Sequence, residues 1–115
     1  MSNNDHKAPD DARIEIIAGT DCTQVNLYGP IDMESSPVVR DRLLTLLQAP
    51  DSKKVSIDLS AVTHFDSSGV ASLIEALKIA RSHNTELSLQ GLQGRLFRFF
   101  EITGIANLFN RSIPR

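Results

Sequence analysis

The stretch between residues 55 and 80 constrains the fold more than any other part of the sequence. Val55, Ile57 and Leu59 alternate with polar residues, which is typical of a strand with one covered face. A polar loop is predicted to close the strand over residues 63–69. Apolar residues then recur at helical spacing, and they predict a buried helix face made of Val70, Leu73, Ile74, Leu77 and Ala80. A strand followed directly by an amphipathic helix indicates an α/β fold.

Shorter patterns predict the remaining elements. Residues 14–17 and 25–29 form two strands, joined by turn residues at 19–21 into a hairpin. Ser36 and Pro37 are the expected N-cap and first residue of a helix that ends before Pro50. A fourth strand over residues 87–90 and a short last helix over residues 96–103, closed by Gly104, follow. The order ββαβαβα predicts a small mixed sheet of four to five strands with its helices mainly on one face.

Length and composition limit the number of domains and the classes of function that this chain can have. A chain of 115 residues has room for one domain, expected over residues 12–110, with flexible polar tails at 1–11 and 111–115. No apolar run approaches the ~20 residues that span a bilayer, so no membrane insertion is expected. A net charge of −2 without a basic block argues against nucleic-acid binding. One cysteine and no secretory leader pattern predict a cytoplasmic protein.

The segment Asp66-Ser67-Ser68-Gly69 is the strongest candidate for a functional site. Catalytic signatures such as a phosphate-binding glycine loop or a zinc-binding His pair are absent, and the three histidines are dispersed, so no metal or cofactor is expected. A serine before a helix is most simply an N-cap. The same position, however, holds a hydroxyl at the positive end of a helix, where a phosphate would be tolerated.

Three ordered segments of the chain resemble the STAS domains of bacterial anti-sigma factor antagonists. They are residues 27–32, residues 55–60 leading into 65–70, and residues 99–105, and the resemblance covers roughly residues 13–110. In that family the residue after the motif aspartate is phosphorylated by a partner kinase, and it maps onto Ser67. The family's acidic residue at the end of the second strand maps onto Asp32.

This resemblance implies a mechanism of partner switching. The unmodified protein would bind an anti-sigma factor that is also a serine kinase and so release a sigma factor. Phosphorylation of Ser67 would end the binding, and a PP2C-type phosphatase would restore it. The added charge, beside Asp66 and Asp32, agrees with that direction because it would repel an acidic partner surface. The protein itself would not be an enzyme.

A helical wheel adds a second expectation about the partner surface. With Val70 as the buried reference, four residues fall on the opposite side and are expected to face solvent: Ser68, Ser72, Glu75 and Ile79. Ile79 is either an ordinary exposed apolar residue or the centre of a partner footprint. The expected partner-binding set is therefore Asp32, Asp66, Ser68, Gly69, Ser72, Glu75 and Ile79.

Two alternatives remain open at this point. Some STAS proteins are small subunits of phospholipid-transport ABC complexes and bind the ATPase through the same helix region. These often have Asp-Thr-Gly-Gly where this chain has a serine pair at Ser67 and Ser68, which favours the kinase substrate. The other alternative is a serine hydrolase with Ser67 as nucleophile and His64 as base, although side chains three residues apart on one tight loop need not converge.

Overall fold

The chain forms four strands and three helices in the predicted order ββαβαβα. The structure is a computed structural model that describes residues 14–49, 53–105 and 107. The elements are β1 (Ile14–Ile17), β2 (Thr23–Ile31), α1 (Ser36–Leu47), β3 (Lys54–Phe65), α2 (Ser67–Ser82), β4 (Glu86–Gln90) and α3 (Gly94–Thr103). The two expected tails lie outside the described residues, and no helix in the described part is long and apolar enough to cross a membrane.

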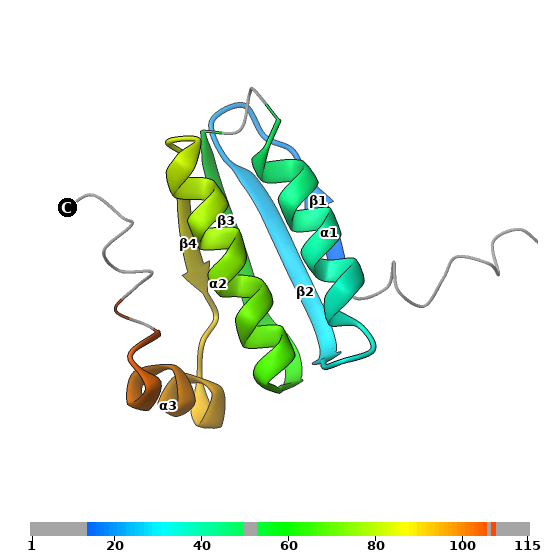
Figure 1. Cartoon of the computed structure of the whole chain (residues 1–115), viewed down its shortest axis with the longest axis vertical. Coiled ribbons are helices and arrows are strands. Elements are labelled where there is room, and N and C mark those ends of the chain that lie inside the picture. Colours follow the sequence, from blue (N-terminus) through cyan, green and yellow to red (C-terminus); the bar gives the residue numbers. More distant parts are fainter. Residues whose placement is uncertain (1–13, 50–52, 106, 108–115) are drawn as a thin grey trace, which may run out of the picture.

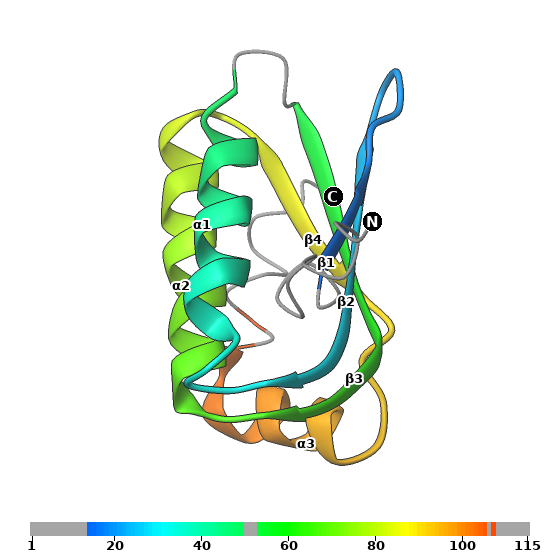
Figure 2. The ribbon, with the colours of Figure 1, turned by 90° about the vertical axis from the view of Figure 1, so that its right-hand side faces the viewer.

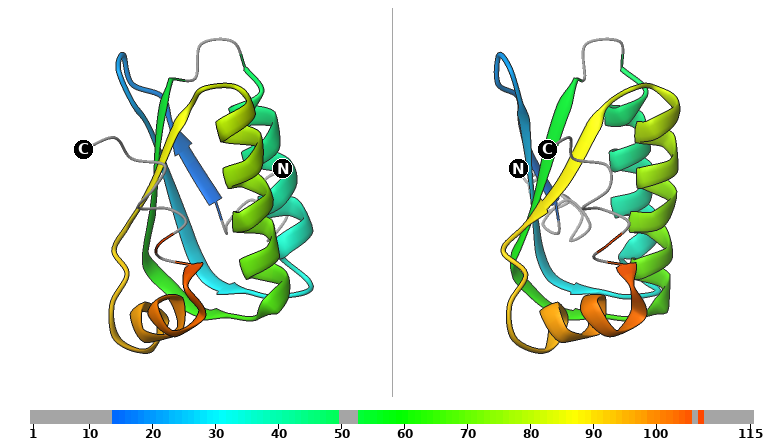
Figure 3. Two further views of the ribbon diagram at one scale, coloured as in Figure 1. Left: turned by 60° about the vertical axis from the view of Figure 1, so that its left-hand side comes forward. Right: turned by 90° about the vertical axis from the view of Figure 1, so that its left-hand side faces the viewer.

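The four strands form one mixed sheet, as predicted. Their spatial order is β1-β2-β3-β4, with β1 antiparallel to β2 and the other two pairs parallel. The crossover helices α1 and α2 lie side by side on one face of the sheet (Figures 1 and 2). Helix α3 lies apart from them, at the end of the molecule where β3 ends and α2 begins (Figure 3).

The hydrophobic core fills the space between the sheet and the two crossover helices. Its fully buried side chains come from every layer, for example Val25 and Leu27 of β2, Leu43 of α1 and Ile57 of β3. The predicted inner face of α2 is confirmed for Val70, Leu73 and Leu77, which are buried. Ile74 is only half-buried and packs at the margin of this core.

The predicted loop over residues 63–65 is wrong, because β3 continues to Phe65. Its partner β2 runs to Ile31, past an irregularity between Gly29 and Pro30, so that Ile31 pairs directly with Phe65. The polar residues of this segment therefore lie on a strand. The continuous pairing brings the carboxyl ends of β2 and β3 to the same edge of the sheet.

The predicted cap of α1 is also displaced by one residue. Ser35 occupies the N-cap position, and Ser36 is the first helical residue. The reason is that the Ser36 N–H already donates to the Asp32 carbonyl at 2.7 Å, which closes the first turn before Pro37. The structure confirms Gly104 as the C-cap of α3, where its φ of 82° is left-handed backbone that favours glycine.

Candidate functional site

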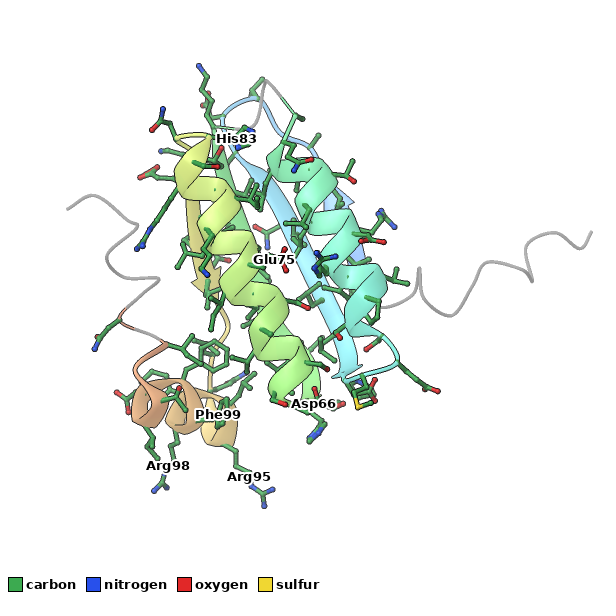
Figure 4. The ribbon with its side chains drawn as sticks, in the orientation of Figure 1. Asp66, Glu75, His83, Arg95, Arg98 and Phe99 are labelled. Atoms are coloured by element: carbon green, nitrogen blue, oxygen red, sulfur yellow. The ribbon has the colours of Figure 1, made fainter. Side chains whose placement is uncertain are left out.

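The site is built on the ends of two neighbouring parallel strands. Asp32 follows β2 and Asp66 follows β3, and the pairing of Ile31 with Phe65 places the two aspartates at one edge of the sheet. The Asp66 N–H donates to the Ile31 carbonyl at 3.3 Å, so the second connection is tied to the first. Asp66 lies at the first turn of α2 (Figure 4).

Asp66, not Ser67, is the N-cap of α2, so the predicted capping role of Ser67 is wrong. One oxygen of Asp66, Oδ1, accepts hydrogen bonds from the Ser68 N–H at 2.9 Å, the Gly69 N–H at 3.2 Å and the Ser68 hydroxyl at 2.6 Å. These bonds give an acceptor to two of the backbone N–H groups that the start of a helix otherwise leaves unpaired. The Ser68 hydroxyl, followed by the Gly69 and Ser68 N–H groups, lowers the pKa of Asp66.

Asp32 organises the turn that leads from β2 into α1. Its Oδ1 accepts the N–H groups of Glu34 at 3.0 Å and Ser35 at 3.1 Å. The Ser35 N–H is the main cause of a lowered pKa at Asp32, while the charge of Asp66 acts in the opposite direction. The two carboxylates thus interact through their charges, and the hydrogen bonds that each accepts favour its ionised form. Two carboxylates therefore lie at this edge of the sheet.

Gly69 is required by the close approach of α2 to β2. A Cβ atom at this position would lie 2.8 Å from the Ile31 carbonyl oxygen and 3.0 Å from the Ile31 Cγ2. A Cβ atom essentially never lies within 3.0 Å of another heavy atom in this way. Gly69 therefore fixes the distance between the start of α2 and the end of β2, and it is a buried part of the frame rather than a contact surface.

Ser67 is the exposed member of the serine pair. It is the first residue of α2, and no other residue in the described part of the chain hydrogen-bonds its hydroxyl. Ser68, by contrast, is half-buried and gives its hydroxyl to Asp66. The two neighbouring serines therefore differ in chemistry, because only Ser67 offers a free hydroxyl to an approaching protein.

The predicted exposure of the stripe on α2 is wrong for Ser72 and holds only in part for Ser68, Glu75 and Ile79, because that side of the helix faces α1. Ser72 is buried, and its hydroxyl donates to the Ser68 carbonyl at 3.0 Å. Glu75 receives two hydrogen bonds from Arg40 of α1, Nε to Oε1 at 2.7 Å and a second guanidinium nitrogen to Oε2 at 3.0 Å. Ile79 is half-buried and packs against the core.

These contacts give the stripe a structural role. The Arg40 guanidinium lowers the pKa of Glu75, as expected for a two-point ion pair across the helix interface. A helix that packs on both a sheet and a neighbouring helix hides more than half of its circumference. Ser72 is therefore excluded from an open partner surface, Ile79 is covered only in part, and Glu75 is already engaged by Arg40.

The structure offers no support for the hydrolase alternative. His64 is exposed on β3, and within the described residues it makes no hydrogen bond to Ser67. Asp66, the third member such a triad would need, has its Oδ1 occupied by Ser68 and Gly69. The described residues also contain no cluster of three or more His, Cys, Asp or Glu side chains suited to a metal ion.

A family model described as "Mlab, STAS domain" matches residues 17–110, which is most of the chain. The chain belongs to the STAS domain family. The resemblance inferred from the sequence segments is thereby confirmed.

Curated relatives of this STAS domain are named anti-sigma-B factor antagonists. The protein from Listeria monocytogenes is 37% identical over 89 residues, which cover 77% of each chain. The protein from Bacillus subtilis is 35% identical over 89 residues, covering 77% of this chain and 80% of its own. A solved structure of the Bacillus cell fate determinant SpoIIAA in the phosphorylated form has a TM-score of 0.68 at 13% identity, covering 88% of both chains, and shares the fold.

The surface of this STAS domain has a pocket that the sequence did not predict. A pocket of about 230 Å³ lies between the end of β3 and α3, and it is lined by Val62, Thr63, His64, Phe65, Arg95, Leu96 and Phe99. Leu96 and Phe99 belong to the apolar face that the spacing of residues predicts for this helix, yet Phe99 is 40% exposed. The sequence shows that this short last helix is rich in aromatic residues, but it does not show the contact with β3 that forms the pocket.

Proposed function

We propose that this STAS domain is an anti-sigma factor antagonist that works by partner switching. In its unphosphorylated form it binds an anti-sigma factor that is also a serine kinase, and a sigma factor is released. The names of the curated relatives at 37% and 35% identity support this function. The domain acts as a binding module without catalysis of its own, in the cytoplasm, and a PP2C-type phosphatase reverses the modification.

Ser67 is the phosphorylation site in this proposal. The observation that carries it is the free, exposed hydroxyl at the first turn of α2, next to a serine whose hydroxyl is engaged by Asp66. A kinase needs an accessible nucleophile, and Ser67 provides one without local unfolding. The phosphorylated form of the structurally similar SpoIIAA supports modification in this fold.

The phosphate would act through local charge. It adds about −1.5 to −2 charges beside Asp66 and Asp32, whose lowered pKa values keep them ionised near neutral pH. The Ser68 and Gly69 N–H groups already bind Asp66, so they are not free to receive the phosphate. The new charge stays on the surface and opposes the return of a partner that packs there.

The test is phosphorylation of the purified chain by the anti-sigma kinase of its own genome. We expect mass spectrometry to map one phosphate to Ser67, and the Ser67→Ala variant to remain unmodified while binding the kinase. Ser68→Ala is the matched control and should still be phosphorylated. Modification at Ser68 alone, or at no residue, would contradict the assignment.

Two further variants separate the switch from the fold. Because Asp66 provides the cap, Ser67→Ala should change the free energy of unfolding by less than about 0.5 kcal/mol, as expected for a surface substitution. Ser67→Asp should fold equally well and bind the kinase more weakly. Recovery of a transporter ATPase instead of a kinase in affinity purification would favour the phospholipid-transport alternative.

A further inference from the structure

The pocket between β3 and α3 combines apolar and polar lining residues. Val62, Phe65, Leu96 and Phe99 are the apolar ones, and Thr63, His64 and the positively charged Arg95 are the polar ones. Its volume of about 230 Å³ is below the ~300–1,000 Å³ of typical small-molecule sites. The pocket is therefore suited to a single side chain from another protein.

This pocket adjoins the serine pair. Phe65, which lines the pocket, directly precedes Asp66 and lies two positions before Ser67. Asp66, Arg95, Arg98 and Phe99 all lie at the same end of the molecule, whereas His83 lies at the other end (Figure 4). A protein that contacts the Ser67 hydroxyl could reach the pocket with the same surface.

The charges on α3 indicate which kind of charged group on a partner would complement this surface. Arg95 and Arg98 are exposed, and neither forms an ion pair with any other described residue. By contrast, Arg40 on α1 is paired with Glu75, and Lys54 on β3 lies 3.9 Å from Glu86. The free cations of α3 thus complement a carboxylate on a partner, next to an apolar group that fills the pocket.

We propose that this pocket is a docking site for the anti-sigma kinase, which inserts an aromatic or aliphatic side chain against Phe99 and pairs a neighbouring carboxylate with Arg95. The inference rests on the proposed function, and it names the contact that holds the kinase while Ser67 is modified. A central apolar anchor in a pocket is the type of contact that dominates binding energy at interfaces. The same acidic segment would be repelled by a phosphate on Ser67.

Helix α3 offers a matched pair of variants for the test. Phe99 and Phe97 are 40% and 41% exposed, but only Phe99 lines the pocket. The probe is the anti-sigma kinase that modifies Ser67, titrated calorimetrically in the presence of ADP so that no phosphate is transferred. We expect Phe99→Ala to raise Kd at least about tenfold and Phe97→Ala to change it less than about threefold.

Charge reversal provides a second measurement, which remains informative if loss of the contact between Phe99 and Phe100 lowers the stability of the first variant. Arg95→Glu should raise Kd about tenfold or more and reduce its dependence on salt. Lys53→Glu, the same charge change at an exposed residue outside the pocket, should leave both nearly unchanged.

The outcomes distinguish the two proposals. Equal effects of Phe99→Ala and Phe97→Ala, or of Arg95→Glu and Lys53→Glu, would overturn the docking site while the wild-type chain still binds its kinase. A wild-type chain that binds no anti-sigma kinase would overturn the proposed function, and the docking site with it.

Discussion

The substitution Gly69→Ala tests whether the close approach of α2 to β2 requires a glycine at the start of the helix. In an ordinary helix, alanine stabilises by about 0.5–1 kcal/mol relative to glycine. Here its Cβ would meet the Ile31 carbonyl oxygen at 2.8 Å, an atom of the sheet backbone that cannot rotate away. Such overpacking costs about 1–3 kcal/mol, so the steric effect should exceed the helix preference.

The expected net loss is about 1–2 kcal/mol in the free energy of unfolding, or roughly 4–8 °C in Tm for a domain of this size. Urea unfolding followed by circular dichroism measures it. The exposed Ala71 of the same helix supplies the reference, because Ala71→Gly reports the helix preference near this end alone. If Gly69→Ala were as stable as the wild type, the helix would be free to move away from Ile31, and the argument from close packing would fail.

Two further predictions concern the core and the acidic edge. Leu73→Ala removes a fully buried side chain of α2 and should lower the free energy of unfolding by about 2–5 kcal/mol; an unchanged urea midpoint would contradict its position. Asp32 and Asp66 have pKa values lowered from 3.8, so the stability they provide is present above that value and is lost as the pH falls through their folded pKa values. Urea denaturation followed from about pH 5 to about pH 2, a window that spans 3.8 and the range below it, should therefore show a smaller loss in the double variant Asp32→Asn/Asp66→Asn than in the wild type, and equal losses would refute this account.

Local patterns predicted the frame of this domain well. Alternation identified the strands, and helical spacing identified α2 with its buried residues Val70, Leu73 and Leu77. These patterns are reliable because apolar residues at a regular spacing mark the buried face of a strand or helix. The end of β3 was missed, since pairing with the end of β2 keeps the polar residue His64 in a strand without burying it.

The local geometry of the candidate site was predicted less well than the order of the strands and helices. The segment offers both Asp66 and Ser67 as caps, and their order along the sequence does not decide which oxygen reaches the free N–H groups. The stripe through Ser72 and Glu75 was misassigned because a helical wheel with one buried reference cannot distinguish solvent from a neighbouring helix. The pocket depends on contact between β3 and α3, which no local pattern reports.

The division of roles within the serine segment explains how the domain could be modified without being unfolded. Asp66 closes the helix start, and Gly69 fixes its distance from β2, so these two residues carry the structural requirements. The Ser68 hydroxyl is engaged by Asp66, whereas the Ser67 hydroxyl makes no hydrogen bond within the described residues. A phosphate on Ser67 therefore breaks no internal contact. The repulsion between this phosphate and the partner can therefore weaken binding directly, because the helix that carries Ser67 does not have to change its structure.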